Sequence, residues 1–396
     1  MTWQTDLIRS LPSPEPEAAA HSARLTAYIR AELAAHGGHI PFSRFMELAL
    51  YAPGLGYYST GTRKFGASGD FITAPELSPL FSRCLARQCA EVLSTNGGDI
   101  LELGAGSGTM AAELLLELEH LAFLPNRYAI LEVSGELRQR QRQTLGERAA
   151  HLLTRVVWLN TLPEPGFRGI ILGNEVLDAM PVERLRITPD GPRPLHVVWE
   201  KDRFVWLVGP EDEAVTHIVM ALQNELGCIL PEGYETEFNL HLPSWLQALA
   251  ERLTAGVVLL IDYGYPRREY YHPQRTTGTL LCHYRHRAHG DPLILLGLQD
   301  ITANVDFTAV ADAAVAAGLT VTGYTSQSYF LFGCGLETLL AEVDPDDTQR
   351  YLELTRQVKL LTLPSEMGER FKAMALSRGV EIPLQGFRLF DERGRL

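Results

Sequence analysis

The sequence predicts an α/β protein built on a doubly wound sheet, with an N-terminal helical segment and an inserted α+β lobe. Three observations support this prediction. Short apolar runs alternate with amphipathic stretches through the middle of the chain, as in parallel sheets covered by helices. The stretch DILELGAGSGTMAAELLLEL (99–118) joins one such run to a helical pattern through a glycine turn. The length of 396 residues leaves room for a lobe beside the main core.

Composition limits the function classes. The net charge of −13 argues against a broad nucleic-acid-binding surface, so no nucleic-acid partner is expected. No apolar run is long enough to cross a bilayer, and the first residues lack the apolar core of a signal peptide, so no membrane insertion is expected. The five cysteines form no CxxC pair, which is typical of free thiols in a reducing compartment. We therefore expect a cytoplasmic protein.

The N-terminal part divides into two predicted units. Residues 1–20 are Pro-rich and are expected to form a loose leader. Residues 21–98 are expected to form a helical segment, with helices from His21 to His36 and from Pro79 to Leu93. Between these helices, residues 59–81 are rich in Gly, Ser and Thr and too long for an ordinary connection, which predicts a functional loop over a cofactor.

The predicted core comes in two parts, residues 99–182 and 254–396. Its expected strands are ILEL, YAILEV, RVVWL, GIILGNEV and GVVLLIDYG, with helices at Met110–Leu121 and Gly135–Leu145. A His/Arg-rich loop, the strand LTVTGYTS, helices and a final GFRLF strand follow. Residues 183–253 contain alternating patterns of antiparallel strands and two helical pieces. We expect this inserted lobe to contact either the substrate or a second subunit of a homodimer.

The glycine turn indicates which ligand the sheet binds. Gly104, Ala105, Gly106 and Gly108 form a GxGxG pattern, and Thr109 stands where a dinucleotide fingerprint has its third glycine. Glu102 precedes the turn, where a carboxylate would repel a pyrophosphate but suit a cationic amino-acid end. S-adenosylmethionine is therefore favoured over NAD. The alternative is a turn that only packs a helix on a strand.

Other strand ends carry polar residues that suit the same ligand, because ligands of such sheets bind at the carboxyl ends of strands. Glu132, followed by Val133, ends the second strand 24 residues after Gly108 and can accept both ribose hydroxyls. Leu159 and Asn160 end the third strand and can flank an adenine, although a turn-forming role for Asn160 is equally compatible. The fourth strand ends in three further polar residues, which are Asn174, Glu175 and Asp178.

Several blocks resemble MidA-like methyltransferases. These blocks are GDFITAPELSPLF, ELGAGSGTM, GNEVLDAMPV, IDYGYP, GTLLCHYRHRAHGDPLILLGLQDITANVDF and EMGERFKAMAL, in the family's order. The resemblance implies a class I fold of seven strands, six parallel and the last reversed. It also implies S-adenosyl-L-methionine as cofactor, with S-adenosyl-L-homocysteine as product. The family includes a mitochondrial complex I assembly factor associated with arginine methylation, so a protein substrate is expected, with arginine favoured.

An arginine acceptor needs carboxylates, because they can hold a guanidinium in a bidentate pair and aim one nitrogen at the methyl group. Glu175 is the first candidate for this catalytic role, with Asp178 beside it. Asp70 and Glu76 of the Gly-rich loop are second candidates. Thr73 is a candidate for the methionine end of the cofactor, although Thr73 and Glu76 also match a helix-capping pattern.

Two further features carry weaker expectations. Asp262 and Tyr263 end the fifth strand and are expected to line the acceptor channel, although a structural role for Tyr263 is as compatible. His283, His286 and His289 complete no metal-ligand spacing, and arginines stand among them, so no metal is expected there.

Two rival functions stay open at this point. One is a small-molecule methyltransferase on the same fold. The other is a cofactor-binding assembly chaperone with little transfer activity. A deep closed pocket would favour a small-molecule acceptor, and an open acidic groove would favour a peptide.

Overall fold

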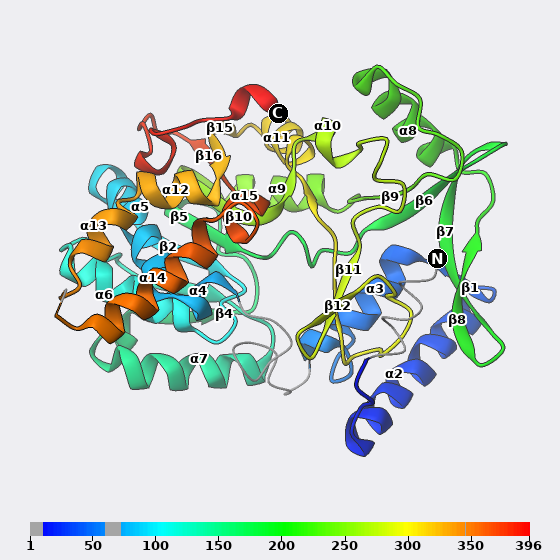
Figure 1. The fold of residues 1–396 in the computed structure, drawn as a ribbon, viewed down its shortest axis with the longest axis horizontal. Coiled ribbons are helices and arrows are strands. Elements are labelled where there is room, and N and C mark those ends of the chain that lie inside the picture. Colours follow the sequence, from blue (N-terminus) through cyan, green and yellow to red (C-terminus); the bar gives the residue numbers. More distant parts are fainter. Residues whose placement is uncertain (1–10, 60–72, 345) are drawn as a thin grey trace.

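The structure, a computed structural model, describes residues 11–59, 73–344 and 346–396. Its largest sheet has eight strands (Figure 1). Seven of them follow one another across the sheet in the order β4 (Val156–Leu159), β3 (Tyr128–Leu131), β2 (Asp99–Leu103), β5 (Phe167–Asn174), β10 (Leu253–Tyr265), β16 (Phe371–Arg378) and β15 (Thr320–Ser326). The strands from β4 to β10 are parallel, and β16 is antiparallel to both of its neighbours. The count exceeds the expected seven because β14 (Val305–Asp306) pairs with the end of β10.

Helices cover both faces of this sheet, as a doubly wound sheet requires. Along β5, Ile170 and Leu172 pack with one helical layer, whereas Ile171 packs with the other. This division follows from the two-residue period of a strand. The first layer comprises α5 (Pro79–Asn96), α6 (Thr109–His120), α12 (Gln327–Gly333), α13 (Leu336–Ala341) and α14 (Thr348–Thr362); the second comprises α9 (Leu242–Arg252) and α11 (Phe307–Ala316). Helix α7 (Gly135–Arg148) lies beside α6.

A second, antiparallel sheet lies on the right of Figure 1. It comprises β1 (His39–Pro41), β7 (Gly191–Glu200), β6 (Glu183–Thr188) and β9 (Glu235–Phe238), with β8 (Arg203–Val208) also paired to β7. Because β1 pairs with β7, the N-terminal segment joins the 183–253 region. Phe42 and Phe45 pack in one core cluster with Val197. This segment also holds α2 (Pro16–Ala35), α3 (Phe42–Tyr51) and η1 (Tyr57–Ser59), while α8 (Glu213–Leu226) follows β8.

The region of the predicted His/Arg-rich loop forms regular structure instead. β11 (Leu281–Tyr284) and β12 (Arg287–His289) make a hairpin, and β13 (Asp300–Thr302) pairs with the other side of β11. Arg285 and His286 supply the turn with positive φ angles. The hairpin carries β13, and with it Asp300, to the edge of the cavity described below.

Two boundaries also differ from expectation. Helix α2 begins at Pro16, inside the predicted leader, since Pro is favoured in the first turn of a helix. The expected final GFRLF strand is instead the 3-10 turn η3 (Gln385–Phe387). A Cβ on Gly386 would lie 2.4 Å from the Phe330 ring, so this backbone packs directly against α12. The last strand is β16, where Met374 and Leu376 alternate with residues that face the other layer.

The remaining short elements are α4 (Ala74–Leu77), η2 (Ala150–Arg155), α10 (Arg267–Tyr270), α15 (Met367–Arg370) and η4 (Arg393–Arg395). Among the described helices, none combines the length and apolar character that a bilayer crossing requires.

Candidate active site

The glycine turn opens a cavity at the carboxyl ends of the central strands. Gly104 and Gly106 have φ angles of 68° and 51°, a region that glycine adopts without the cost of a Cβ. Both glycines and Ala105 line a cavity of about 590 Å³. Gly108, with φ 85°, is not among the lining residues, and a Cβ there would lie 3.0 Å from the Cα of Gln141. Gly108 therefore permits the close packing of α6 on α7.

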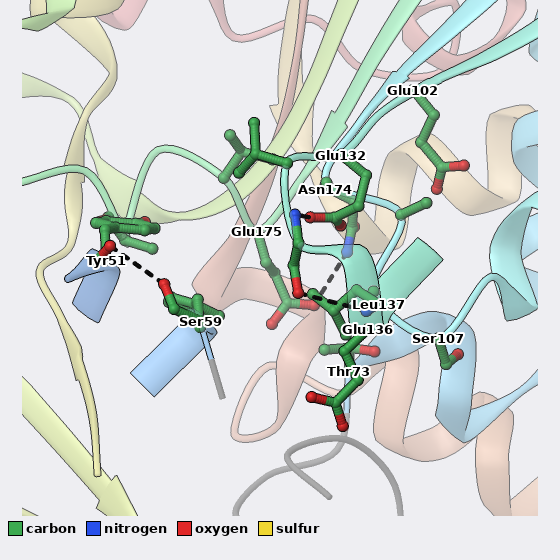
Figure 2. A pocket seen from close by; sticks show the side chains of 18 of the residues that line it. Tyr51, Ser59, Thr73, Glu102, Ser107, Glu132, Glu136, Leu137, Asn174 and Glu175 are labelled. Atoms are coloured by element: carbon green, nitrogen blue, oxygen red, sulfur yellow. Dashed lines mark hydrogen bonds between the residues drawn. The ribbon is translucent and has the colours of Figure 1, made fainter. Parts of the chain in front are cut away.

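Most of the predicted site residues meet in this cavity (Figure 2). They come from the ends of β2, β3 and β5 and from the start of α4. The lining includes Thr73, Glu76, Glu102, Gly104, Ala105, Gly106, Glu132, Val133, Asn174, Glu175 and Asp178. Asp70 lies outside the described residues.

Glu102 and Glu132 are buried carboxyl groups on neighbouring strands. The Tyr128 hydroxyl donates to Glu102 at 2.8 Å, and burial raises the pKa of Glu102 to about 7. Glu132 accepts hydrogen bonds from the Ser134 amide at 2.9 Å and from Nε2 of Gln141 at 3.1 Å. The same Nε2 donates to the Gly106 carbonyl, so Gln141 ties the glycine turn to Glu132. Burial also raises the pKa of Glu132, against these hydrogen bonds.

Glu76 takes part in the site and not in a capping box. Thr73 is the N-cap residue of α4, but its side chain makes no capping hydrogen bond. The Glu76 carboxylate instead accepts a hydrogen bond from the Ser107 hydroxyl in the glycine turn. This contact holds helix α4 against the glycine turn.

Glu175 follows β5 with a φ angle of 53°, which is uncommon for a residue with a side chain. Its amide donates to the Ile261 carbonyl at 2.9 Å, and Nδ2 of Asn174 donates to its carboxylate at 3.1 Å. Burial and the nearby charge of Asp178 raise the pKa of Glu175 to about 8. Such a carboxyl group changes charge near neutral pH and gains from a positively charged ligand.

Asp178 is 5% exposed and uses its two oxygens differently. Oδ2 accepts a hydrogen bond from the Tyr263 hydroxyl at 2.6 Å. Oδ1 is buried without a hydrogen-bond partner among the described residues. Burial raises the pKa of Asp178 to about 6, although the Tyr263 hydroxyl and the nearby backbone amides of Ala179 and Asp178 oppose this shift. An unpaired buried acceptor beside a cavity is a group that a bound donor would satisfy.

Asp262 and Tyr263 do not line the cavity, contrary to expectation. Asp262 is 1% exposed, and its Oδ2 accepts from the amides of Val176, Leu177 and Asp178 at 3.1, 2.9 and 3.3 Å. These contacts turn its carboxylate toward the backbone that follows Glu175. Asp262 and Tyr263 therefore hold the segment that carries Glu175 and Asp178 without lining the cavity.

Leu159 and Asn160 are also absent from the cavity lining, contrary to expectation. The Leu159 carbonyl and Oδ1 of Asn160 both accept hydrogen bonds from Nη2 of Arg138, each at 2.6 Å. Arg138 belongs to α7, so this contact ties the end of β4 to that helix.

The cavity also has walls that the sequence did not identify. Ser134 to Leu137 follow Glu132, and the N-cap position of Ser134 was a readable signal. Tyr51, Tyr58 and Asp300 form another wall, from segments far apart in the chain. No local pattern marks these three residues, because only the folding of α3, η1 and β13 around the sheet brings them together.

Comparison with known proteins supports the expected methyltransferase family. A family model for S-adenosyl-L-methionine-dependent methyltransferases matches residues 84–325. The "Protein arginine methyltransferase NDUFAF7 homolog, mitochondrial" of Drosophila melanogaster is 30% identical over 95% of this chain and 92% of its own length. The corresponding Mus musculus protein is 29% identical over 86% of this chain and 81% of its own length.

A crystal structure from Burkholderia thailandensis, bound to S-adenosyl-homocysteine, resembles the whole fold. It is 46% identical, covers 98% of this chain and 100% of its own, and has a TM-score of 0.93.

These comparisons overturn one expectation and establish another. The prediction of a cytoplasmic protein is contradicted, because the curated relatives are named as mitochondrial proteins. The cavity with its glycine turn and two buried carboxyl groups at the strand ends fits the predicted cofactor. The chain belongs to the family of S-adenosyl-L-methionine-dependent methyltransferases.

Proposed function

We propose that this methyltransferase transfers the methyl group to arginine side chains of a protein. The observation that carries the proposal is the placement of Glu175 and Asp178 at the end of β5, in the same cavity as the glycine turn. The relatives named as protein arginine methyltransferases support it.

The cofactor half of the site is assigned to β2 and β3. Glu132 would accept hydrogen bonds from the ribose hydroxyls, and the backbone of Gly104 to Gly106 would allow close approach of the amino-acid end. Glu102 supplies a carboxyl group there, and Thr73 and Asn174 add hydrogen-bonding groups. Oδ1 of Asn174 is buried and unpartnered among the described residues, which suits a donor on the ligand. Val133 lines the cavity and is 79% exposed, so it would lie at the solvent-facing edge of the ligand.

The acceptor half is assigned to Glu175 and Asp178. A guanidinium has five N–H donors in a planar fork, and two carboxylates can accept several of them at once. This arrangement aims one nitrogen and concentrates electron density on it. Since methyl transfer is an in-line displacement, such positioning accounts for much of the rate.

S-adenosyl-L-methionine supplies the methyl group, and its sulfur keeps the electron pair of the broken bond. The acceptor nitrogen forms the new N–C bond and must lose one proton. Glu175 is the assigned acceptor of that proton. The positive charge of a bound guanidinium favours the ionised form of Glu175, and burial makes this carboxylate a stronger base than an ordinary glutamate. Asp178 keeps the methylated guanidinium charged and in place. Glu76 holds α4 against the glycine turn through Ser107. Asp70 and Glu76 stay the second candidates for holding the guanidinium.

We further propose the domain roles expected from the sequence. Residues 99–182 and 254–396 hold nearly all of the main sheet and the glycine turn. Residues 21–98 supply Tyr51 and Tyr58 to the acceptor side. The inserted lobe 183–253 has no described residue in the cavity lining and supports the acceptor side through its pairing with residues 21–98. The pairing of β1 with β7 supports this grouping. Tyr51 lines the cavity and is 39% exposed as a residue, which supports access for a protein acceptor over an enclosed small molecule. A homodimer formed through the inserted lobe stays a prediction, and light scattering would measure the oligomeric state.

The test uses purified protein, methyl-labelled S-adenosyl-L-methionine and the protein fraction of a lysate from a strain lacking the gene. We expect label in a discrete protein band and methylarginine after its hydrolysis. Glu175→Gln should lower the labelling rate about 100-fold, since the group that accepts the proton is removed. Asn160→Ala, at a strand end outside the cavity, is the matched control and should keep the wild-type rate.

The outcomes separate the rival functions. Label confined to small molecules would refute a protein acceptor, and label on another side chain would refute arginine. Normal S-adenosyl-homocysteine binding without any transfer would favour an assembly chaperone.

A further inference from the structure

We infer that Asp300 and the hydroxyl of Tyr58 form a recognition element for the positive charge of the acceptor side chain. The inference rests on the proposed function and extends it to residues outside the methyltransferase sheet. Asp300 begins β13 in the three-stranded sheet, and Tyr58 belongs to η1. Both line the cavity that contains Glu175 and Asp178.

The carboxylate of Asp300 is held in a defined orientation. It is 2% exposed, and the Tyr58 hydroxyl donates to both of its oxygens, at 2.9 and 3.0 Å. These two residues are 242 positions apart in the chain, so only the tertiary fold creates the pair. A buried carboxylate fixed in this way needs little reordering when a ligand binds.

Aromatic rings stand beside this carboxylate. The rings of Tyr51 and Tyr58 stack with centroids 5.5 Å apart and an interplanar angle of 22°. The Tyr51 hydroxyl donates to the Ala179 carbonyl at 2.9 Å, which anchors this wall to the segment after Asp178. Figure 2 shows Tyr51 and Ser59 on one side of Glu175, with Glu102 and Ser107 on the other. The aromatic wall is therefore separate from the glycine turn.

The charge of the described lining favours a positively charged ligand. Its described lining residues include seven acidic side chains and no Lys, Arg or His. The charges of Asp178 and Asp300 both act on Glu175 and favour its protonated form. Oδ1 of Asp178 is buried and has no described hydrogen-bond partner. A ligand that brings positive charge and several N–H donors would relieve the repulsion and satisfy this oxygen.

A guanidinium matches this set of groups better than a compact ammonium ion. It is planar, it can pair with carboxylates along its edges, and its face can stack on a tyrosine ring. Asp300 is therefore assigned to acceptor selectivity, and Glu175 to the transfer step.

The decisive variant is Asp300→Asn. The amide keeps an oxygen that can accept from Tyr58, so the wall is retained while the charge is removed. Asp190→Asn, in an exposed turn, is the matched control. Tyr58→Phe is a second variant, which keeps the ring and removes the donor. The initial rate of arginine labelling is measured against the concentration of lysate protein, together with the Kd for S-adenosyl-homocysteine and the thermal midpoint.

We expect Asp300→Asn to lower kcat/KM for the lysate acceptor about 10-fold or more, mainly through KM, because a charged hydrogen bond is lost. Tyr58→Phe should cause a smaller loss in the same direction. Asp190→Asn should match the wild type. The Kd for S-adenosyl-homocysteine and the thermal midpoint should stay unchanged in all three variants.

Two results would overturn the inference alone. One is an unchanged kcat/KM in Asp300→Asn and Tyr58→Phe. The other is a loss that follows a weaker Kd for S-adenosyl-homocysteine or a lower thermal midpoint, which would assign Asp300 to the cofactor or to the fold. A wild-type protein that labels no arginine would refute the proposed function itself, and is recognised before any variant is compared.

Discussion

The hydroxyl of Tyr263 donates a 2.6 Å hydrogen bond to the carboxylate of Asp178, which lies 85 residues earlier in the chain. This bond leaves one Asp178 oxygen engaged and the other unpartnered, among the described residues, at the cavity. Tyr263 thus acts on the acceptor side through Asp178, without lining the cavity itself.

Tyr263→Phe tests this relationship. The hydroxyl favours the charged form of Asp178, whose pKa is about 6, so its loss should raise that pKa. The acidic limb of kcat/KM should then move to higher pH, with activity reduced several-fold at pH 7 and largely recovered at pH 9. A pH–rate profile measures the shift. A uniform loss at every pH would instead indicate a packing defect.

Asp262→Ala tests the support beneath Glu175. The Asp262 carboxylate accepts from three consecutive amides after Glu175 and from the amide of Tyr263. Removing it leaves buried donors unpaired, so the free energy of unfolding should fall by about 2–4 kcal/mol. Urea denaturation measures this change. Asp262→Asn keeps one acceptor oxygen and should lose less, and equal losses in both variants would contradict the hydrogen-bonding role.

The titration of Glu175 predicts a pH-dependent stability. Its pKa is about 8 in the folded protein, whereas glutamate in an unfolded chain titrates at about 4.3. Between these values the unfolded state has released a proton that the folded state retains, so a rise in pH favours unfolding. The contribution of Glu175 to the stability of the ligand-free protein is therefore lost as the pH rises from about 4.5 to about 8.

Glu175→Gln should remove this dependence. The free energy of unfolding of the wild type should fall relative to that of the variant between pH 5 and pH 8, as measured by urea denaturation. Glu164→Gln, at an exposed position, is the matched control and should follow the wild type. Parallel curves for the wild type and Glu175→Gln would show that the carboxyl group does not titrate in this range.

Glu132→Gln tests the cofactor half. Replacing an acceptor carboxylate with an amide should weaken S-adenosyl-homocysteine binding about 10-fold or more, because the charged hydrogen bonds to the ribose are lost. Isothermal titration calorimetry gives the Kd. Asn160→Ala should bind as the wild type does, because Asn160 pairs with Arg138 away from the cavity lining. A larger loss in Asn160→Ala than in Glu132→Gln would reverse this assignment.

Gly108→Ala tests whether Gly108 serves helix packing, because Gly108 contacts α7 and is not among the described residues that line the cavity. The residue has a positive φ angle, and a Cβ would lie 3.0 Å from a backbone atom of Gln141. We expect a loss of about 1–3 kcal/mol in the free energy of unfolding. Gly135→Ala is the control, since a Cβ there meets nothing within 4 Å. Thermal unfolding compares them, and an equal midpoint for both variants would contradict the packing role.

The sequence alone was sufficient to predict those parts of the site that short stretches of the chain form. The period of two in the strands, the glycine turn before α6 and the acidic residues at the ends of β2, β3 and β5 are all readable along the chain. Parallel strands bring their carboxyl ends to one edge, so the order of strands and helices is enough to group Glu102, Glu132 and Glu175.

Tertiary structure decided which of these side chains line the cavity. Asp262 and Asn160 also end strands, yet one turns to the backbone after Glu175 and the other to Arg138, because buried donors must be paired. Tyr51, Tyr58 and Asp300 reach the cavity only because β1 and β13 join sheets beside the core. The chain by itself thus determined the fold class and the cofactor, through short-range patterns. The acceptor wall depended on contacts between distant segments, which no local pattern encodes.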